Sequence, residues 1–79
     1  MKLETITVSP GERRVLLMFD PLCRASTDDR IRSYLTSSGL EPRRQYRETR
    51  DETDYEVYYF GHCYIEPHLD SLTRMAAED

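Results

Sequence analysis

Residues 55–68 read YEVYYFGHCYIEPH, and this stretch decides how the second half of the chain folds. Its first six residues are mostly aromatic or β-branched, which is typical of a β-strand. Because side chains alternate along a strand, one face carries Tyr55, Val57 and Tyr59, and the other carries Glu56, Tyr58 and Phe60. A strand with rings on both faces either lies between two packed layers or presents rings to a partner.

The end of the same stretch predicts a helix. Gly61 breaks the strand, and Pro67 suits the first turn of a helix because its missing N–H would have no intrahelical partner there. This final helix buries one face, made of Leu69, Leu72, Met75 and Ala76. Upstream, the strand returns from an arginine-rich strand, RRQYRETR at 43–50, through a turn at 51–54.

The first half of the chain follows a similar plan. Residues 15–19, VLLMF, are five consecutive apolar residues bounded by turn signals, which predicts a strand buried on both faces at the centre of a sheet. The turn Ser9-Pro10-Gly11-Glu12 joins it to an alternating strand at 3–8.

A first helix follows this central strand. Ser26 or Thr27 caps it, and Asp28 and Asp29 occupy the first turn, where the helix dipole favours acidic groups. Gly39 ends it as a left-handed cap. Its buried stripe consists of Ile31, Tyr34 and Leu35, with Leu40 folding back on Leu35.

The order ββαββα predicts an α+β two-layer sandwich, with an antiparallel sheet and two short helices on one face. The 79 residues form one domain, 1–79. A core of this size gains stability by self-association, so we expect a homodimer, which light scattering would detect. The two halves share a plan, although small α+β domains often do so by chance.

Composition restricts the environment and the chemistry. The formal charge is −4, and ten of the eleven basic residues are arginine, which suits fixed ion pairs and interfaces. No apolar run approaches the ~20 residues that span a bilayer, and no signal peptide is recognisable. Two cysteines without a CxxC pair indicate reduced thiols, so we expect a cytoplasmic protein that does not enter a membrane.

A zinc- or thiol-dependent site is one alternative function. Polar side chains follow both central strands: Asp20, Cys23, His62, Cys63, His68 and Asp70. If these strands were parallel neighbours, the two connections would meet and could hold zinc or a reactive thiol. However, adjacent His62 and Cys63 lack the spacing of metal ligands, so we predict no metal, no cofactor and no catalytic residue.

Nucleic-acid binding is a second alternative. The hairpin at 43–60 sets arginines beside aromatic rings, the combination that single-stranded RNA or DNA recognition uses on a sheet. Against it, residues 41–56 contain four arginines and six acidic residues, whereas binders of polyanions show a basic footprint.

Protein binding fits best. Tyrosine and arginine are enriched in interface hot spots. We therefore predict a small, acidic, non-catalytic interaction module that inhibits or regulates a larger molecular machine, for example one that handles nucleic acid. The predicted partner-binding residues are Arg44, Arg47, Tyr58, Phe60 and Tyr64.

Overall fold

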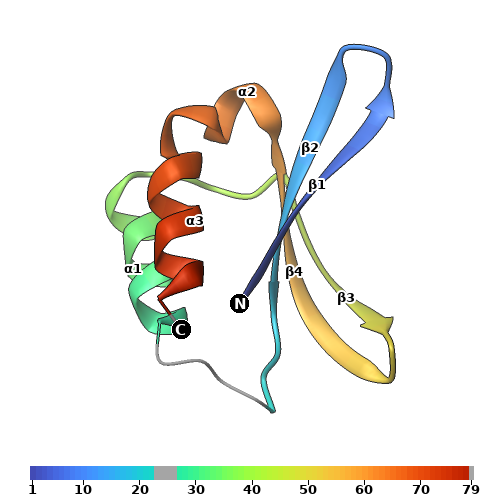
Figure 1. Cartoon of the computed structure of the whole chain (residues 1–79), viewed down its shortest axis with the longest axis vertical. Helices are drawn as coiled ribbons and strands as arrows, with labels where there is room; N and C mark the ends of the chain where they lie inside the picture. The colour runs from blue at the N-terminus through green and yellow to red at the C-terminus, as the bar shows by residue number, and fades with distance from the viewer. Residues whose placement is uncertain (23–26, 79) are drawn as a thin grey trace.

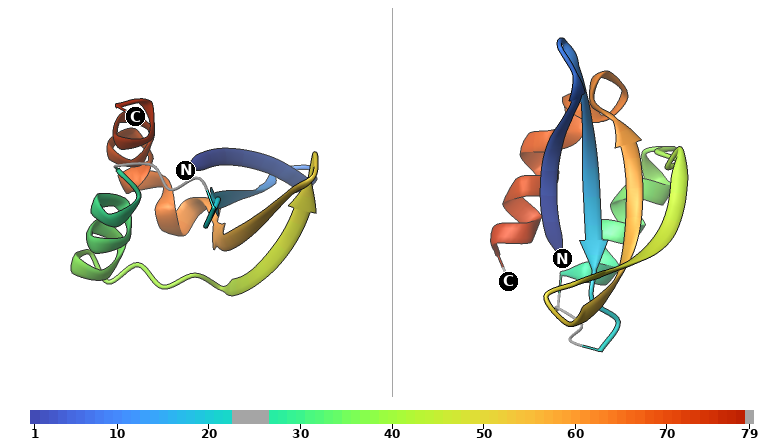
Figure 2. Two further views of the ribbon diagram at one scale, coloured as in Figure 1. Left: turned by 90° about the horizontal axis from the view of Figure 1, so that it is seen from below. Right: turned by 90° about the vertical axis from the view of Figure 1, so that its right-hand side faces the viewer.

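The structure, a computed structural model, describes residues 1–22 and 27–78 as a four-stranded antiparallel sheet with helices on one face (Figures 1 and 2). The strand order is β1-β2-β4-β3. The elements are β1 (Lys2–Ser9), β2 (Glu12–Phe19), α1 (Asp28–Ser37), β3 (Arg44–Arg50), β4 (Thr53–Gly61), α2 (His62–Ile65), the 3-10 turn η1 (Glu66–His68) and α3 (Leu69–Ala77). The predicted α+β class and the order of strands and helices are confirmed.

The apolar run of β2 lies at the centre of the sheet, as predicted. Its five residues, from Val15 to Phe19, are at most 3% exposed. Val15, Leu17 and Phe19 pack towards the helices, and the two residues between them pack on the opposite face. β2 is therefore buried on both faces, because an apolar cluster covers it on each side of the sheet.

The helix face of the sheet carries the main core. It joins Val15, Leu17, Phe19 and Phe60 to side chains of the helices and their connections, namely Ile31, Leu35, Leu40, Ile65 and Leu72. Gly39 has a φ of +68°, and the Leu40 N–H donates to the Leu35 carbonyl over 2.9 Å, which confirms the predicted left-handed cap.

The opposite face, called here the open face, is turned away from the helices. It carries Leu16, Met18 and Val57, which are nevertheless at most 3% exposed. They are covered because the sheet curls, and Figure 2 (left) shows β1 and the β3–β4 hairpin converging over this face. Partly buried side chains complete the cluster: Ile6, Tyr46, Tyr55 and Tyr59.

An arginine joins the two edge strands across the curled face. Arg50 of β3 donates from Nη1 to Glu4 of β1 over 2.5 Å and from Nη2 to Glu48 over 2.7 Å. The hydrogen bond to Glu4 is the main reason that the pKa of Arg50 is raised. The two free edges of the sheet are thus bridged at one point.

The two halves are related by an approximate two-fold plan. In the order β1-β2-β4-β3, each half contributes one outer strand, β1 or β3, and one inner strand, β2 or β4. The two inner strands are antiparallel neighbours. An offset of 41 residues relates α1, which begins at Asp28, to α3, which begins at Leu69. The same offset relates Phe19 to Phe60, two buried phenylalanines.

Three local predictions need correction. Thr27 occupies the N-cap position of α1, but its hydroxyl makes no capping hydrogen bond, and Ser26 lies outside the described residues. Gly61 is the last residue of β4, and helix α2 begins directly after it. The second turn contains only Asp51 and Glu52, because β4 already begins at Thr53.

A buried acidic side chain fixes the start of α1. Asp28 is 3% exposed, and its carboxylate lies 3.1 Å from the α-amino nitrogen of Met1. Asp28 and Asp29 occupy the first helical turn, as predicted. The contact with Met1 therefore ties the first helix to the beginning of β1.

A candidate binding cleft at one end of the sheet

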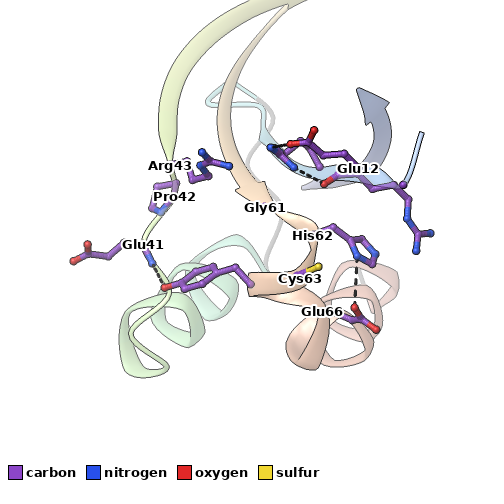
Figure 3. Close-up of a pocket in the computed structure, with 12 residues that line it drawn as sticks. Glu12, Glu41, Pro42, Arg43, Gly61, His62, Cys63 and Glu66 are labelled. Atoms are coloured by element: carbon purple, nitrogen blue, oxygen red, sulfur yellow. Dashed lines mark hydrogen bonds and ion pairs between the residues drawn. The ribbon is translucent and has the colours of Figure 1, made fainter. Parts of the chain in front are cut away.

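A cleft of about 670 Å³ opens at the end of the sheet where the β1–β2 turn lies (Figure 3). Three segments line it, within residues 11–14, 41–43 and 61–66. They come from the first hairpin, from the connection between α1 and β3, and from the junction of β4 with α2. The cleft therefore exists only once both halves of the chain have packed together.

Backbone pairing and one tyrosine hold these segments in place. Arg14 pairs with Gly61 at the end of the central ladder, and the Arg43 N–H donates to the Tyr59 carbonyl over 2.8 Å. The Tyr64 hydroxyl donates to the Gly39 carbonyl over 3.0 Å. It also accepts from the backbone N–H of Glu41, in the connection between α1 and β3. Tyr64 thereby joins α2 to the segment that leads into β3.

Charged side chains in the first hairpin form a local network. Arg14 forms an ion pair with Glu12 and donates to the Arg13 carbonyl over 3.0 Å. Glu12 also accepts from the Ser9 hydroxyl over 3.0 Å. The Ser9 hydrogen bond, followed by the bond to Arg14, lowers the pKa of the Glu12 carboxyl.

Other arginines at this end keep their charge available. Across residues 1–22 and 27–78, no salt bridge includes Arg13, Arg43 or Arg44. Arg13 and Arg43 line the cleft, and Arg44 follows at the start of β3. A guanidinium that is not neutralised attracts carboxylates and phosphates.

The cleft also contains a thiol and a histidine. The Cys63 side chain is free and exposed, and His62 Nδ1 lies 3.6 Å from Glu66 Oε2. The other histidine, His68, hydrogen bonds through Nδ1 to the Tyr34 hydroxyl over 2.8 Å. Within the part of the chain that the structure describes, no hydrogen bond joins Cys63 to a histidine, the contact that activates a cysteine nucleophile.

The arrangement that the zinc hypothesis required does not occur. β2 and β4 are neighbours, but they run antiparallel, so Asp20 and His62 follow opposite ends of the central pair. Cys23 lies outside the described residues. Among residues 1–22 and 27–78, no group of three or more His, Cys, Asp or Glu side chains could hold a metal ion.

The five predicted partner-binding residues do not lie on one exposed surface, and two of them pack on the helix face of the sheet. Phe60 is fully buried in the helix-face core, and Tyr58 packs against Phe19 on the same side, with ring centroids 5.2 Å apart. Burial is the main reason that the pKa of Tyr58 is raised. Arg47 pairs with Glu56, which alternation also places on the helix face.

The remaining two predicted residues do reach exposed surface, at different places. Arg44 lies on the open face, where it pairs with Tyr59. Tyr64 is in α2, where it is 50% exposed and lines the cleft. The alternation along β4 is as predicted, and the helices cover the face that carries Tyr58 and Phe60.

Sequence reasoning missed the tyrosines of the open face. Tyr46, Tyr55 and Tyr59 surround its buried cluster, and the Arg44 guanidinium lies 5.7 Å from the centroid of the Tyr46 ring. By register, this face also carries four basic side chains and three acidic ones, namely Lys2, Arg14, Arg44, Arg50, Glu4, Glu12 and Glu48. The alternation of side chains along the strands identifies the residues of the open face once it is known that Leu17 and Phe19 point towards the helices.

The open face and the cleft are continuous. Arg14 and Gly61 form the last pair of the central ladder, and Tyr59, two residues before Gly61, pairs with Arg44. Arginine and tyrosine side chains of β2, β3 and β4 therefore lie on one continuous surface at this end of the sheet.

None of the helices in the described residues is both long and apolar enough to cross a membrane. Comparisons with known protein families, with curated proteins and with solved structures find no match to this chain.

Proposed function

We propose that this chain is a small, non-catalytic protein-interaction module that works in the cytoplasm and regulates a larger protein partner. Its binding surface is the open face together with the adjoining cleft. The observation that carries this proposal is the grouping of Tyr46, Tyr55, Tyr59 and Arg44 on the sheet face turned away from the helices. Tyrosine and arginine contribute most to binding energy in protein interfaces.

The distribution of charge supports the same surface. The whole chain has a formal charge of −4, yet the open face carries more basic than acidic side chains. A locally basic surface on an acidic protein is approached preferentially by an acidic region of a partner, with the rest of the molecule turned away. This asymmetry favours one orientation of binding.

Single-stranded nucleic acid is the second candidate. Rings beside arginines on an open sheet face support it, because bases stack on such rings. Two of the arginines on this face are already engaged, since Arg50 bonds to Glu4 and Glu48, and Arg14 to Glu12. Among the described residues, Arg44 is the one arginine of the open face outside a salt bridge, so a protein partner is the first choice.

A homodimer would be one form of this interaction. The large apolar side chains that are exposed within residues 1–22 and 27–78 are Val8, Leu22 and Tyr64, from three separate segments. A dimer would therefore be formed through polar and aromatic surface rather than through an apolar patch. Light scattering at micromolar concentration should give twice the monomer mass, and a monomer mass throughout would remove this part of the proposal.

The function is tested by substitution on the open face. Arg44→Glu and Tyr59→Ala should each weaken capture of a partner from cells of the native host by at least ~10-fold, as expected for hot-spot side chains. Arg74→Glu is the matched control, because Arg74 is an exposed arginine of α3, away from this face. Thermal melts establish that each variant folds.

Binding to a labelled single strand should be weak at physiological salt. If a single strand binds tightly and Arg44→Glu abolishes that binding, the nucleic-acid candidate replaces the protein partner. If neither a protein nor a single strand is retained by the wild-type chain, the proposed function is wrong.

A further inference from the structure

We infer that the cleft receives an acidic segment of the partner protein, whose carboxylates pair with Arg43 and Arg13. This inference rests on the proposed function, since it gives the chemistry of the partner at one part of the same surface. It concerns the cleft alone, which lies next to the tyrosines of the open face.

Arg43 lines the cleft in a position to bind a carboxylate. In Figure 3 its side chain extends over Gly61 towards the side of the cleft where Glu12 lies. A Cβ atom at Gly61 would lie 3.9 Å from the Cδ and Nη1 atoms of Arg43, so the missing side chain keeps the surface low beside the guanidinium. A planar guanidinium at an open surface can bind a carboxylate through two parallel hydrogen bonds.

Within residues 1–22 and 27–78, no acidic side chain forms a salt bridge with Arg43 or Arg13, although Arg43 lies close enough to Glu12 to contribute to the lowered pKa of that carboxyl. Glu12 is engaged by Arg14 and Ser9, and Glu66 lies beside His62. Glu41 extends away from the cleft in Figure 3. Both guanidinium groups therefore keep hydrogen-bond donors for a carboxylate in the cleft.

The distribution of charge on the chain favours an acidic peptide over a nucleic acid. The basic side chains at this end are few, and the chain as a whole is acidic. A short peptide segment can place its carboxylates at this end only, whereas a nucleic-acid strand carries a charge on every nucleotide and continues past acidic surface. Tyr64, half exposed at the rim of the cleft, provides apolar contact for the peptide backbone or an apolar side chain.

The inference is tested with a fluorescein-labelled peptide of Glu, Asp and Gly. A peptide of Gln, Asn and Gly with the same length is the neutral control, and oligothymidylate of similar length is the nucleic-acid control. Fluorescence anisotropy should show that the acidic peptide binds at least ~10-fold more tightly than the neutral one, with affinity that falls as salt rises.

Arg43→Glu should weaken binding of the acidic peptide by at least ~10-fold, because it replaces an attractive charge by a repulsive one. Arg43→Ala should have a smaller effect in the same direction and guards against misfolding of the first variant. Arg74→Glu, the same change at an exposed arginine of α3, should leave binding within about twofold of wild type.

Cys63 gives a second readout at the site itself, because its exposed thiol lines the cleft. In a Cys23→Ser background, saturating acidic peptide should slow the reaction of Cys63 with a neutral thiol reagent several-fold, and the neutral peptide should not. An acidic peptide that binds without slowing this reaction occupies another surface and overturns the inference.

Failure of the inference and failure of the proposed function give different results. If a partner from the native host needs Arg44 and Tyr59 but is captured equally well by Arg43→Glu and at high salt, the function stands and the acidic segment is wrong. If oligothymidylate binds more tightly than the acidic peptide, both are overturned in favour of nucleic acid. Loss of the partner and of the peptide together in Arg43→Glu supports both.

Discussion

The two hairpins have the same topology but differ in the backbone conformation of their turns. The β1–β2 turn consists of Pro10 and Gly11, and Gly11 has a φ of +77°. The β3–β4 turn, 41 residues later, consists of Asp51 and Glu52, with φ values of +52° and +65°. The first turn thus places glycine where the backbone needs it, and the second places two side chains in the left-handed region.

The strands next to each turn show the consequence. Proline followed by a residue of positive φ is the pattern of a type II turn, whose twist does not match that of paired strands. The first hairpin accordingly shifts register between Thr7 and Ser9. Positive φ at both central residues is the type I′ pattern, which matches the strand twist, and β3 and β4 pair without a shift.

This difference shows that a common plan does not impose a common local structure. The first hairpin has residues suited to its turn but an irregular ladder. The second has a regular ladder, maintained at the cost of backbone strain at Asp51 and Glu52, each disfavoured by roughly 1 kcal/mol relative to glycine. Substitutions in each half can show how far the two halves are equivalent and where they differ.

The largest loss of stability is expected at the position where the two halves are most alike. Phe19→Ala and Phe60→Ala should each lower the free energy of unfolding by about 3–5 kcal/mol, because each empties a fully buried site on the helix face. Urea denaturation measures both losses. A domain of this size has little stability in excess, so both variants should be mostly unfolded at 37 °C.

Tyr55→Phe on the open face is the control and should change stability by less than about 1 kcal/mol, since the ring is retained. If one alanine variant folds normally while the other does not, the two phenylalanines are not equivalent and the two-fold plan is only topological.

The turns should show opposite responses to substitution. Replacing Asp51-Glu52 by Asn-Gly should raise the free energy of unfolding by about 1 kcal/mol, because these residues tolerate positive φ. Gly11→Ala should lower it by a similar amount. No atom lies within 4 Å of the Cβ that this change adds, so the cost comes from the backbone alone.

Thermal unfolding should resolve both changes, with midpoint shifts of roughly 4–8 °C in opposite directions. A destabilised Asn-Gly variant would mean that the side chains of Asp51 and Glu52 contribute more than their backbone conformation costs.

The smallest effect concerns pH and belongs to the first hairpin. The Ser9 hydroxyl and Arg14 lower the pKa of Glu12, so the ionised form is favoured in the folded protein. The stability that this carboxylate contributes is present above the unfolded pKa of a glutamate and is lost as pH falls through the lower folded value.

Glu12→Gln should therefore melt less pH-dependently than wild type in the acidic range, and the two curves should approach each other at the lowest pH. NMR titration of the Glu12 side chain checks the direction of the shift directly. A midpoint at or above that of an unfolded glutamate would contradict the Ser9 and Arg14 contacts.

Much of the fold could be predicted from local patterns. The five apolar residues at 15–19 indicate a central strand because only a strand covered on both faces needs them, and Gly39 followed by Leu40 specifies the end of α1. Helix α2 was missed because four residues have little helical stability of their own. It is held instead by the burial of Ile65 and by the hydroxyl of Tyr64.

The candidate site was harder to predict because it depends on how the halves meet. Alternation separates Tyr59 from Phe60 but does not say which of them faces the helices. The answer follows from the antiparallel pairing of β2 with β4, which joins residues far apart in the chain. The same pairing brings Arg14 to Gly61 and creates the cleft, so no single segment contains its signal.

The two hairpin turns lie at opposite ends of the molecule's longest axis, which spans 34 Å (Figure 1). The cleft end holds Arg13, Arg14 and Arg43 beside Glu12, Glu41 and Glu66, whereas the other turn holds Asp51, Glu52 and Asp54 beside Arg50. The turn end is therefore the more negative of the two, which gives the molecule an electric dipole on which the field of a charged partner exerts a torque. Stopped-flow measurements should therefore find that salt slows association more than it changes dissociation. If the partner is acidic as proposed, we expect the molecule to turn cleft-first before any side chain touches it.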